Sequence, residues 1–156
     1  MENPKNTVFT AIEINATTEE VWSVLTDWKK LKEWSSSFVG ISVDQLVKGE
    51  SFKVYFKNPL NGEVLEFERV CTEYEEGKKF GWSGELTSHG FIDNHIYTLE
   101  PTKSGATLFK QEDGIHGKHS KLVNLLSKKH MKSMYEKFNI QLKERVESIY
   151  RYTRNG

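Results

Sequence analysis

One histidine and one aspartate lie in largely apolar segments of the chain, and together they could transfer protons. His95 falls in a stretch that alternates between apolar and polar residues, and Asp113 ends the next such stretch. Residues two apart in a strand point to the same side, so His95 shares a face with Tyr97. By the same rule Asp113 shares a face with Gln111 and Phe109. If the two stretches form a hairpin, we expect His95 to lie roughly opposite Gln111, with Phe109 or Asp113 as its diagonal neighbour.

This arrangement has two interpretations. A histidine close to a carboxylate in apolar surroundings could act as a general acid or base, with the carboxylate fixing its tautomer. Alternatively, His95 and Gln111 satisfy each other's hydrogen bonds in the interior, or bind the polar group of a ligand. Glu112 neighbours Asp113 but points to the opposite face by parity, unless a bulge exchanges the two. For the first interpretation, the predicted catalytic residues are His95 and Asp113.

Other reactive groups give weaker signals. Arg69 alternates with Phe67 and Cys71, so its guanidinium could meet a ligand carboxylate if that face is buried, although an exposed strand arginine is equally expected. The single cysteine, Cys71, excludes an intramolecular disulfide and is expected to be buried and inert. His116 and His119 lack a third ligand at a suitable spacing, so we predict no metal. Neither a phosphate loop nor a dinucleotide fingerprint occurs, and no cofactor is expected.

Composition narrows the class of protein. A chain of 156 residues has the usual length of one domain, and we expect a single domain over 1–156. Twenty-two basic and 22 acidic residues leave no net charge to hold a polyanion, which argues against a nucleic-acid partner. No stretch approaches the ~20 apolar residues of a membrane span, and residues 1–6 do not resemble a secretory signal. A cytoplasmic protein without stable membrane insertion is expected, and its oligomeric state is left open.

Hydrophobic periodicity predicts the elements that position these residues. Residues 7–15 alternate and are rich in β-branched side chains, which indicates a strand. Thr17 then caps a helix with acidic residues in its first turn, and Trp28, Leu31 and Trp34 line a second short helix. Turn signals divide the next part of the chain into six antiparallel strands, expected at about 41–47, 51–57, 63–75, 78–87, 91–100 and 105–114.

The periodicity becomes helical after His119. One long helix of roughly thirty residues is expected there, with an apolar stripe of Leu122, Leu126, Met134, Phe138, Leu142, Val146 and Ile149. A locally basic segment leads into it and comprises His116, Lys118, His119, Lys121, Lys128, Lys129, His130 and Lys132. That segment either attracts an anionic ligand or membrane surface, or forms an ordinary solvated helix face.

These elements assemble into an α+β fold. A curved, seven-stranded antiparallel sheet carries two short helices after its first strand, and the long C-terminal helix crosses its concave face. A curved sheet and one helix leave a cup that large side chains only partly fill, which favours a pocket. The predicted ligand-binding residues are Trp34, Phe38, Phe52, Val54, Phe56, Phe67, Trp82, Tyr97, Phe109, Gln111, Met134 and Phe138.

Several short motifs resemble those of the polyketide cyclase/dehydrase branch of the START/Bet v 1-like (SRPBCC) superfamily. They are IEINA at 12–16, EVWSVLTDW at 20–28, Trp34, GESF at 49–52, FGWSG at 80–84, HIYTLE at 95–100, GAT at 105–107 and FNIQLK at 138–143. The resemblance spans nearly the whole chain and implies a helix-grip fold. It also implies a deep cavity between the sheet and the C-terminal helix for a hydrophobic or amphipathic small molecule. The motifs specify the fold, not a reaction.

Three functions are consistent with this fold. The first is binding of a lipid-like, aromatic or polyketide-like molecule in the cavity. The second is a cyclase- or dehydratase-type enzyme, with His95 and either Asp113 or Tyr97 transferring protons. The third is a co-chaperone-like protein-interaction domain, which would show an exposed apolar patch and a cavity filled by side chains.

Overall fold

The fold was analysed in a computed structural model, which describes residues 7–85, 92–116 and 120–155. The side chains that it describes are those of residues 7–84, 92–115 and 128–151.

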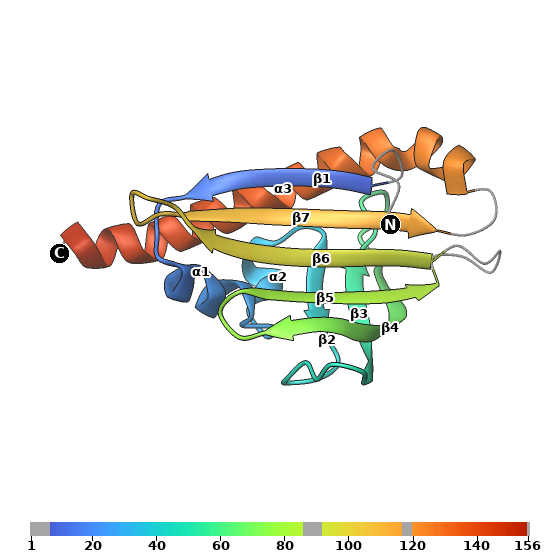
Figure 1. The fold of residues 1–156 in the computed structure, drawn as a ribbon, viewed down its shortest axis with the longest axis horizontal. Helices are drawn as coiled ribbons and strands as arrows, with labels where there is room; N and C mark the ends of the chain where they lie inside the picture. The colour runs from blue at the N-terminus through green and yellow to red at the C-terminus, as the bar shows by residue number, and fades with distance from the viewer. Residues whose placement is uncertain (1–6, 86–91, 117–119, 156) are drawn as a thin grey trace.

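A seven-stranded antiparallel sheet forms the body of the molecule (Figure 1). Its strands are β1 (Thr7–Ile14), β2 (Phe38–Ile41), β3 (Ser51–Lys57), β4 (Val64–Glu75), β5 (Lys79–Glu85), β6 (Ile92–Pro101) and β7 (Thr107–His116). Their order in the sheet is β1-β7-β6-β5-β4-β3-β2, so the first strand pairs with the last. The helices are α1 (Thr18–Leu25), α2 (Leu31–Trp34) and α3 (Ser120–Asn155). The predicted helix-grip architecture is confirmed.

The start of α1 follows directly from its sequence. Thr17 Oγ1 accepts a hydrogen bond from the Glu20 backbone N–H at 3.2 Å, and Glu20 Oε1 accepts one from the Thr17 N–H at 2.9 Å. This reciprocal capping box satisfies two amide groups that the helix itself cannot pair. Val21 and Leu25 then bury completely against the sheet. The predicted Thr17 cap is therefore confirmed.

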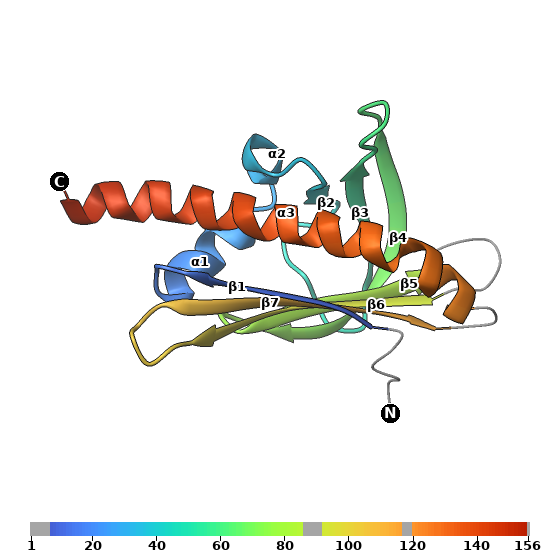
Figure 2. The ribbon, with the colours of Figure 1, turned by 90° about the horizontal axis from the view of Figure 1, so that it is seen from above.

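Helix α3 crosses one face of the sheet from end to end (Figure 2). Among its described side chains, at 128–151, the buried ones are Tyr135, Phe138, Asn139, Leu142 and Val146, and Leu122 and Leu126 of the predicted stripe lie outside this range. The predicted stripe was wrong at Ile149, which is 39% exposed. Beside the C-terminal part of α3 lies α1, and there Tyr150 makes the contact instead, its hydroxyl 2.9 Å from Ser23 Oγ. Within the described residues, no helix combines the length and apolar character that a membrane span requires.

The second strand begins earlier than the predicted 41–47. It covers Phe38–Ile41 and pairs Phe38 with Phe56 and Ile41 with Val54 of β3. The alternation that misled the prediction has another cause, because Leu46 is buried in the core without belonging to a strand. Packing against the core can produce the same apolar spacing as strand pairing.

Candidate functional site

The inner faces of β6 and β7 change from polar to apolar along their length. Along β6 the buried side chains are Asp93, His95, Tyr97 and Leu99 in that order. On the neighbouring strand Asp113 lies opposite His95, and Gln111 and Phe109 lie opposite Tyr97 and Leu99. The polar end is where β6 begins and β7 ends, and Tyr135 and Asn139 of α3 contact it. The interior is therefore amphipathic.

The register between β6 and β7 differs from the predicted one by two residues. His95 lies directly opposite Asp113, whereas the sequence analysis placed it opposite Gln111. The connection between the two strands is centred one residue later than expected, because Gly105 adopts a positive φ of 86° and Thr102 accepts the Gly105 N–H at 3.1 Å. Because the partner of each residue is displaced by two positions, every side chain stays on the same face of the sheet. Asp113 is thus buried and Glu112 exposed, as parity predicted.

A chain of hydrogen bonds runs from the histidine across to β1. The acceptor for the N–H of His95 Nε2 is Gln111 Oε1, at 2.8 Å. The Gln111 amide donates in turn to Asn139 Oδ1 at 2.6 Å and to the Tyr135 carbonyl at 3.3 Å. Asn139 Nδ2 then donates to Thr10 Oγ1 at 3.0 Å. This chain fixes the imidazole tautomer, with the proton on Nε2 and a lone pair on Nδ1.

The other ring nitrogen of His95 faces a second polar pair. His95 Nδ1 lies 3.8 Å from Asp113 Oδ2, and the Tyr135 hydroxyl donates a hydrogen bond to the same carboxylate oxygen. The imidazole is enclosed by the rings of Tyr97 and Tyr135, whose centroids lie 4.3 and 4.7 Å from its own. A proton on Nδ1 would therefore meet a carboxylate that a phenol already orients.

Burial sets the protonation states of this cluster. Desolvation lowers the pKa of His95 from 6.5 to about 4, although the Gln111 hydrogen bond and the nearby Asp93 act in the opposite direction. Desolvation, and then the charge of Asp113, raise the pKa of both Tyr97 and Tyr135 well above 10.0. At neutral pH the imidazole is uncharged and both phenols keep their protons, so Tyr135 is a hydrogen-bond donor.

A buried ion pair completes the polar end. Arg69 Nη2 of β4 lies 3.0 Å from Asp93 Oδ2, and both side chains are at most 7% exposed. Desolvation and repulsion by Asp113 raise the pKa of Asp93 to about 6, against the opposing effect of Arg69. A glycine makes room for the pair, because a Cβ on Gly84 would lie 2.6 Å from Arg69 Cδ and from the Glu68 carbonyl oxygen. Gly84 also donates its N–H to Asp93 Oδ1 at 3.0 Å.

The rest of the interior is filled by aromatic rings, beginning with Trp82, which lies opposite His95 in the sheet. Phe38 packs against Trp82 and Phe138, with ring centroids 5.5 and 6.1 Å apart, and Phe138 lies 6.3 Å from Phe109. Separations of this size are favourable aromatic contacts. These side chains form the core of the protein, and they occupy space that the resemblance assigned to a deep cavity.

A hollow opens at the rim of the molecule, between α3, the segment that precedes β2 and the segment that follows β3. Its volume is about 210 Å³. It is lined by Ser36, Ser37, Lys57, Pro59, His130, Ser133, Met134 and Lys137. Trp34 is partly exposed and packs on Phe138 at 5.2 Å, which links this part of the rim to the interior. The hollow therefore lies next to the aromatic core, since Met134 lines it one helical turn before Phe138.

The structure divides the sequence-predicted binding residues into two groups. Eight are buried in the interior: Phe38, Phe52, Val54, Trp82, Tyr97, Phe109, Gln111 and Phe138. Four lie partly exposed at its edge: Trp34, Phe56, Phe67 and Met134. His95 and Asp113 lie close together. Arg69 is buried, so it is not the exposed strand arginine that was the alternative interpretation.

Some of the residues singled out by the sequence fall outside the described part of the chain. Lys118 and His119 lie there entirely, and the side chains of His116 and Lys121 are likewise outside the described set. Among the side chains that are described, no group of histidine, cysteine and acidic residues is arranged to hold a metal ion. Cys71 is buried, and burial raises the pKa of its thiol.

Four polar residues of the site were missed by sequence reasoning. Asp93 carried a usable signal, since it lies two residues before His95 and so shares its face. Tyr135 and Asn139 are four residues apart, which places them on one side of α3 beside Phe138. Thr10 gave no signal, because its role depends on β1 pairing with β7.

Solved structures similar to this fold come from several bacteria. Protein NE0264 of Nitrosomonas europaea has a TM-score of 0.74 at 17% identity, covering 96% of this chain and 99% of that chain. A START superfamily protein of Mycobacterium smegmatis gives 0.68 at 16% identity, covering 92% and 98%. DynU16, a protein of the dynemicin biosynthetic locus, gives 0.70 at 19% identity, covering 92% of this chain and 48% of its own. At these identities the likeness concerns the fold.

Sequence comparison gives the family. A search among curated proteins finds no significant match. The sequence does match the family described as polyketide cyclase / dehydrase and lipid transport, over residues 6–147. Because the match covers most of the 156 residues, this chain belongs to the polyketide cyclase / dehydrase and lipid transport family.

Proposed function

We propose that this protein binds an amphipathic small molecule between the sheet and α3. Membership of a family of cyclases, dehydrases and lipid transport proteins supports a ligand-binding or cyclase-type function. The single observation that carries the finer proposal is the polar-to-apolar gradient from Asp93 to Leu99 along buried β6. The apolar part of the ligand, lipid-like, aromatic or polyketide-like, contacts the rings of Tyr97 and Phe138. Its polar group lies at His95 and Asp113.

The gradient determines which ligands are favoured. Apolar burial supplies about 25 cal/mol per Å², less the cost of association, and flat rings add aromatic contacts. A wholly apolar ligand inserted among these groups would break hydrogen bonds that they now make with one another, at roughly 1–3 kcal/mol for each group left unpaired. A ligand that carries an oxygen or nitrogen at one end avoids this penalty, so amphipathic molecules are selected over hydrocarbons.

The ligand must create part of its own space. The rim hollow of about 210 Å³ is smaller than the roughly 300–1,000 Å³ of common small-molecule sites. In this proposal the hollow is the mouth of the site; Met134 lines it, and Met134 and Trp34 are both partly exposed. We expect ligand entry to displace Trp34 from its 5.2 Å contact with Phe138.

Native mass spectrometry of the purified protein tests this proposal, followed by denaturing extraction and identification of what is released. We expect a stoichiometric compound with one polar and one apolar end. His95→Phe should lose it, because the imidazole is replaced by a ring without hydrogen-bonding groups. Phe9→Ala, on the outer face, should retain it, since Phe9 is 48% exposed. Retention of a purely hydrocarbon compound by all three proteins, or a protein partner in its place, would contradict the proposal.

A cyclase- or dehydratase-type reaction is a second candidate, favoured by the geometry of His95. The Nδ1 lone pair faces Asp113 at 3.8 Å, so a proton taken from a carbonyl-containing substrate would be stabilised by the carboxylate. Tyr135 or Tyr97 would give a proton to the substrate oxygen, and the proton taken up by His95 would then restore the phenol, directly or through Asp113 Oδ2. With the extracted compound as substrate, His95→Gln should abolish turnover and change binding little. Unchanged turnover would exclude His95 as the catalyst.

A further inference from the structure

The hairpin between β3 and β4 carries an apolar side chain far into solvent. Leu60, at its tip, is 93% exposed, and Val64 and Leu65 on the following strand are 58% and 40% exposed. Figure 2 shows the hairpin extending past α3 on the helix side of the sheet. The tip has a defined turn, because Asn58 accepts hydrogen bonds from the Leu60 and Gly62 amides at 2.9 and 2.8 Å. Leu60 is thus held outward by an ordered turn.

Basic side chains lie beside this tip. Lys57, His130 and Lys137 line the rim hollow together with Pro59, and none of its eight lining residues is acidic. Other lysines are neutralised, as Lys143 is by Glu147 at 3.0 Å. Among the described residues, neither Lys57 nor Lys137 forms an ion pair. In a chain with no net charge, this hollow is a local concentration of positive charge.

We propose that the hairpin tip and the basic hollow dock together on the surface of an anionic lipid bilayer. Leu60 enters the interface between headgroups and acyl chains, and Lys57 and Lys137 face the headgroups. One exposed leucine on a narrow hairpin is far from the roughly 1,000 Å² that a specific protein interface buries, whereas it suits an interface that has no fixed shape. The charge of the hollow then selects anionic over neutral lipid.

Docking gives the mouth a role. It would place the rim hollow against the bilayer, so that an amphipathic molecule passes between membrane and interior without crossing water. This consequence rests on the proposed ligand binding, whereas docking itself does not and can be measured on the empty protein. The attachment is peripheral and reversible, because a single apolar side chain and two lysines supply only modest affinity.

Co-sedimentation of the full chain with vesicles tests the proposal. The vesicles are phosphatidylcholine alone, or phosphatidylcholine and phosphatidylglycerol at a ratio of about 7 to 3, since anionic lipid attracts basic side chains. We expect at least tenfold stronger binding to the anionic vesicles, lost at high salt because the charges are exposed. Each lysine near such a surface is worth about fivefold, so Lys57→Glu with Lys137→Glu should weaken binding by more than tenfold. Leu60→Ser should weaken it severalfold.

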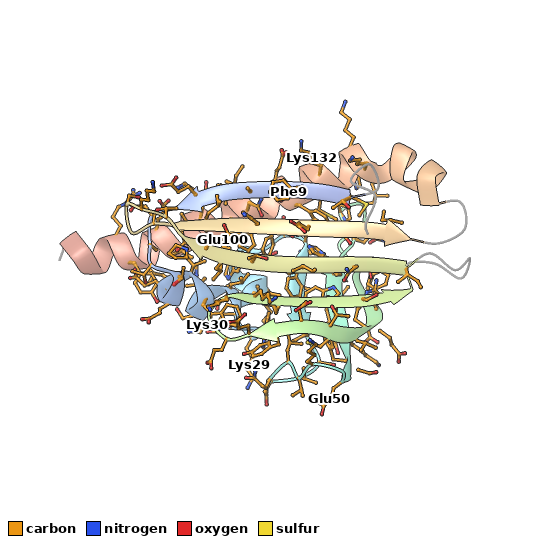
Figure 3. All side chains as sticks on the ribbon, viewed as in Figure 1. Phe9, Lys29, Lys30, Glu50, Glu100 and Lys132 are labelled. Carbon is orange, nitrogen blue, oxygen red and sulfur yellow. The ribbon has the colours of Figure 1, made fainter. Side chains whose placement is uncertain are left out.

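Matched controls separate the site from general charge. Lys29→Glu with Lys30→Glu changes net charge equally, and Figure 3 shows both residues at the opposite edge of the molecule from Lys132 of α3. Val47→Ser matches Leu60→Ser, since Val47 is 45% exposed elsewhere on the surface. Both control proteins should bind anionic vesicles as the wild type does. Equal loss in control and test variants, or equal binding to neutral vesicles, would overturn the proposal.

A direct probe of the tip covers the case in which a variant fails to fold. Cys71 is buried, so Leu60→Cys can be labelled at residue 60 with an environment-sensitive fluorophore. Its emission should shift to the blue with anionic vesicles and remain unchanged with neutral ones. No shift with either would overturn the proposal, as would a dimer that Leu60→Ser converts to a monomer in sedimentation velocity, since a second copy would then cover the tip. Failure here would leave the ligand recovered by mass spectrometry unaffected.

Discussion

The two ends of the interior are equally buried but chemically opposite. Near α1, Phe80 and Leu99 pack against other apolar side chains. Near the start of α3, Arg69, Asp93 and His95 are at most 5% exposed, and they depend on polar partners. Apolar packing stabilises the fold directly, whereas a buried ion pair of good geometry often contributes no more than apolar residues of similar volume would. Folding alone therefore explains the first end better than the second.

This contrast makes the polar end the better candidate for ligand binding. A small domain could fill its interior with apolar residues throughout, and an apolar replacement for a buried polar network is commonly neutral or stabilising. Here the network includes two acids, an arginine and a histidine within one end of the cup. We infer that these groups serve ligand binding more than they serve stability. Substitutions at the two ends should accordingly have different signatures.

The largest effect is expected at the apolar end. Phe80→Ala removes a fully buried ring whose centroid lies 4.7 Å from that of Tyr97 and 5.3 Å from that of Trp28. The free energy of unfolding should fall by about 3–5 kcal/mol at every pH, since the loss is one of packing. Chemical denaturation measures this, with Phe9→Ala on the outer face as the control. A loss below about 1 kcal/mol would mean that this end is not the stabilising core.

Breaking the ion pair should cost slightly less and depend on pH. Arg69→Met leaves Asp93 as a buried, uncompensated charge, at about 3 kcal/mol near pH 7.5. The raised pKa of Asp93, about 6, means that the folded protein binds a proton between pH 4 and 6 that the unfolded chain does not, so lower pH relieves the cost. The penalty should shrink at pH 5. Adding Asp93→Asn should restore part of the lost stability, and an equal loss at both pH values would contradict this account.

His95 should make the protein sensitive to acid. Its pKa is lowered from 6.5 to about 4, so the unfolded state takes up a proton first as pH falls through this window, and stability is lost. The full effect is about 3 kcal/mol at pH 4. Asp93 acts in the opposite direction there, so the difference between wild type and His95→Gln is the quantity to measure. The variant should lose less stability than wild type from pH 6.5 to 4, and parallel curves would contradict a buried neutral His95.

The smallest effect is expected for Tyr135→Phe. It removes the hydroxyl that donates to Asp113 and leaves the ring on His95, with centroids 4.7 Å apart. A buried carboxylate that loses one donor should cost about 1–2 kcal/mol. Tyr55→Phe, at a partly exposed tyrosine of β3, is the matched control and should change stability by less than about 0.5 kcal/mol. Equal values for the two variants would show that Asp113 does not depend on Tyr135.

Local signals account for most of the fold that the sequence predicted. Capping at Thr17 and strand alternation act over a few residues, and parity alone placed Asp113 inward and Glu112 outward. Errors arose where local and long-range causes produce the same pattern. The apolar spacing after Ile41 reflects burial of Leu46, and the register at His95 depends on the conformation of Gly105.

The candidate site was predictable only in part for the same reason. His95, Gln111 and Asp113 lie on adjacent strands joined by a short turn, so hairpin geometry brings them together. Asp113 and Tyr135 are 22 positions apart in the chain, and Arg69 and Asp93 are 24 apart. The first contact depends on how α3 lies over the sheet, and the second on β4 and β6 lying on either side of β5, which no local pattern specifies.

The most direct test of the amphipathic site is an NMR titration of ¹⁵N-labelled protein with 8-anilinonaphthalene-1-sulfonate, a probe with one polar and one aromatic part. The account predicts that the largest amide shifts fall at residues 93–97 of β6 and 111–113 of β7, where the polar and aromatic ends of the interior meet. Shifts confined to Leu60 and the outer face of the sheet, with β6 and β7 unchanged, would contradict it.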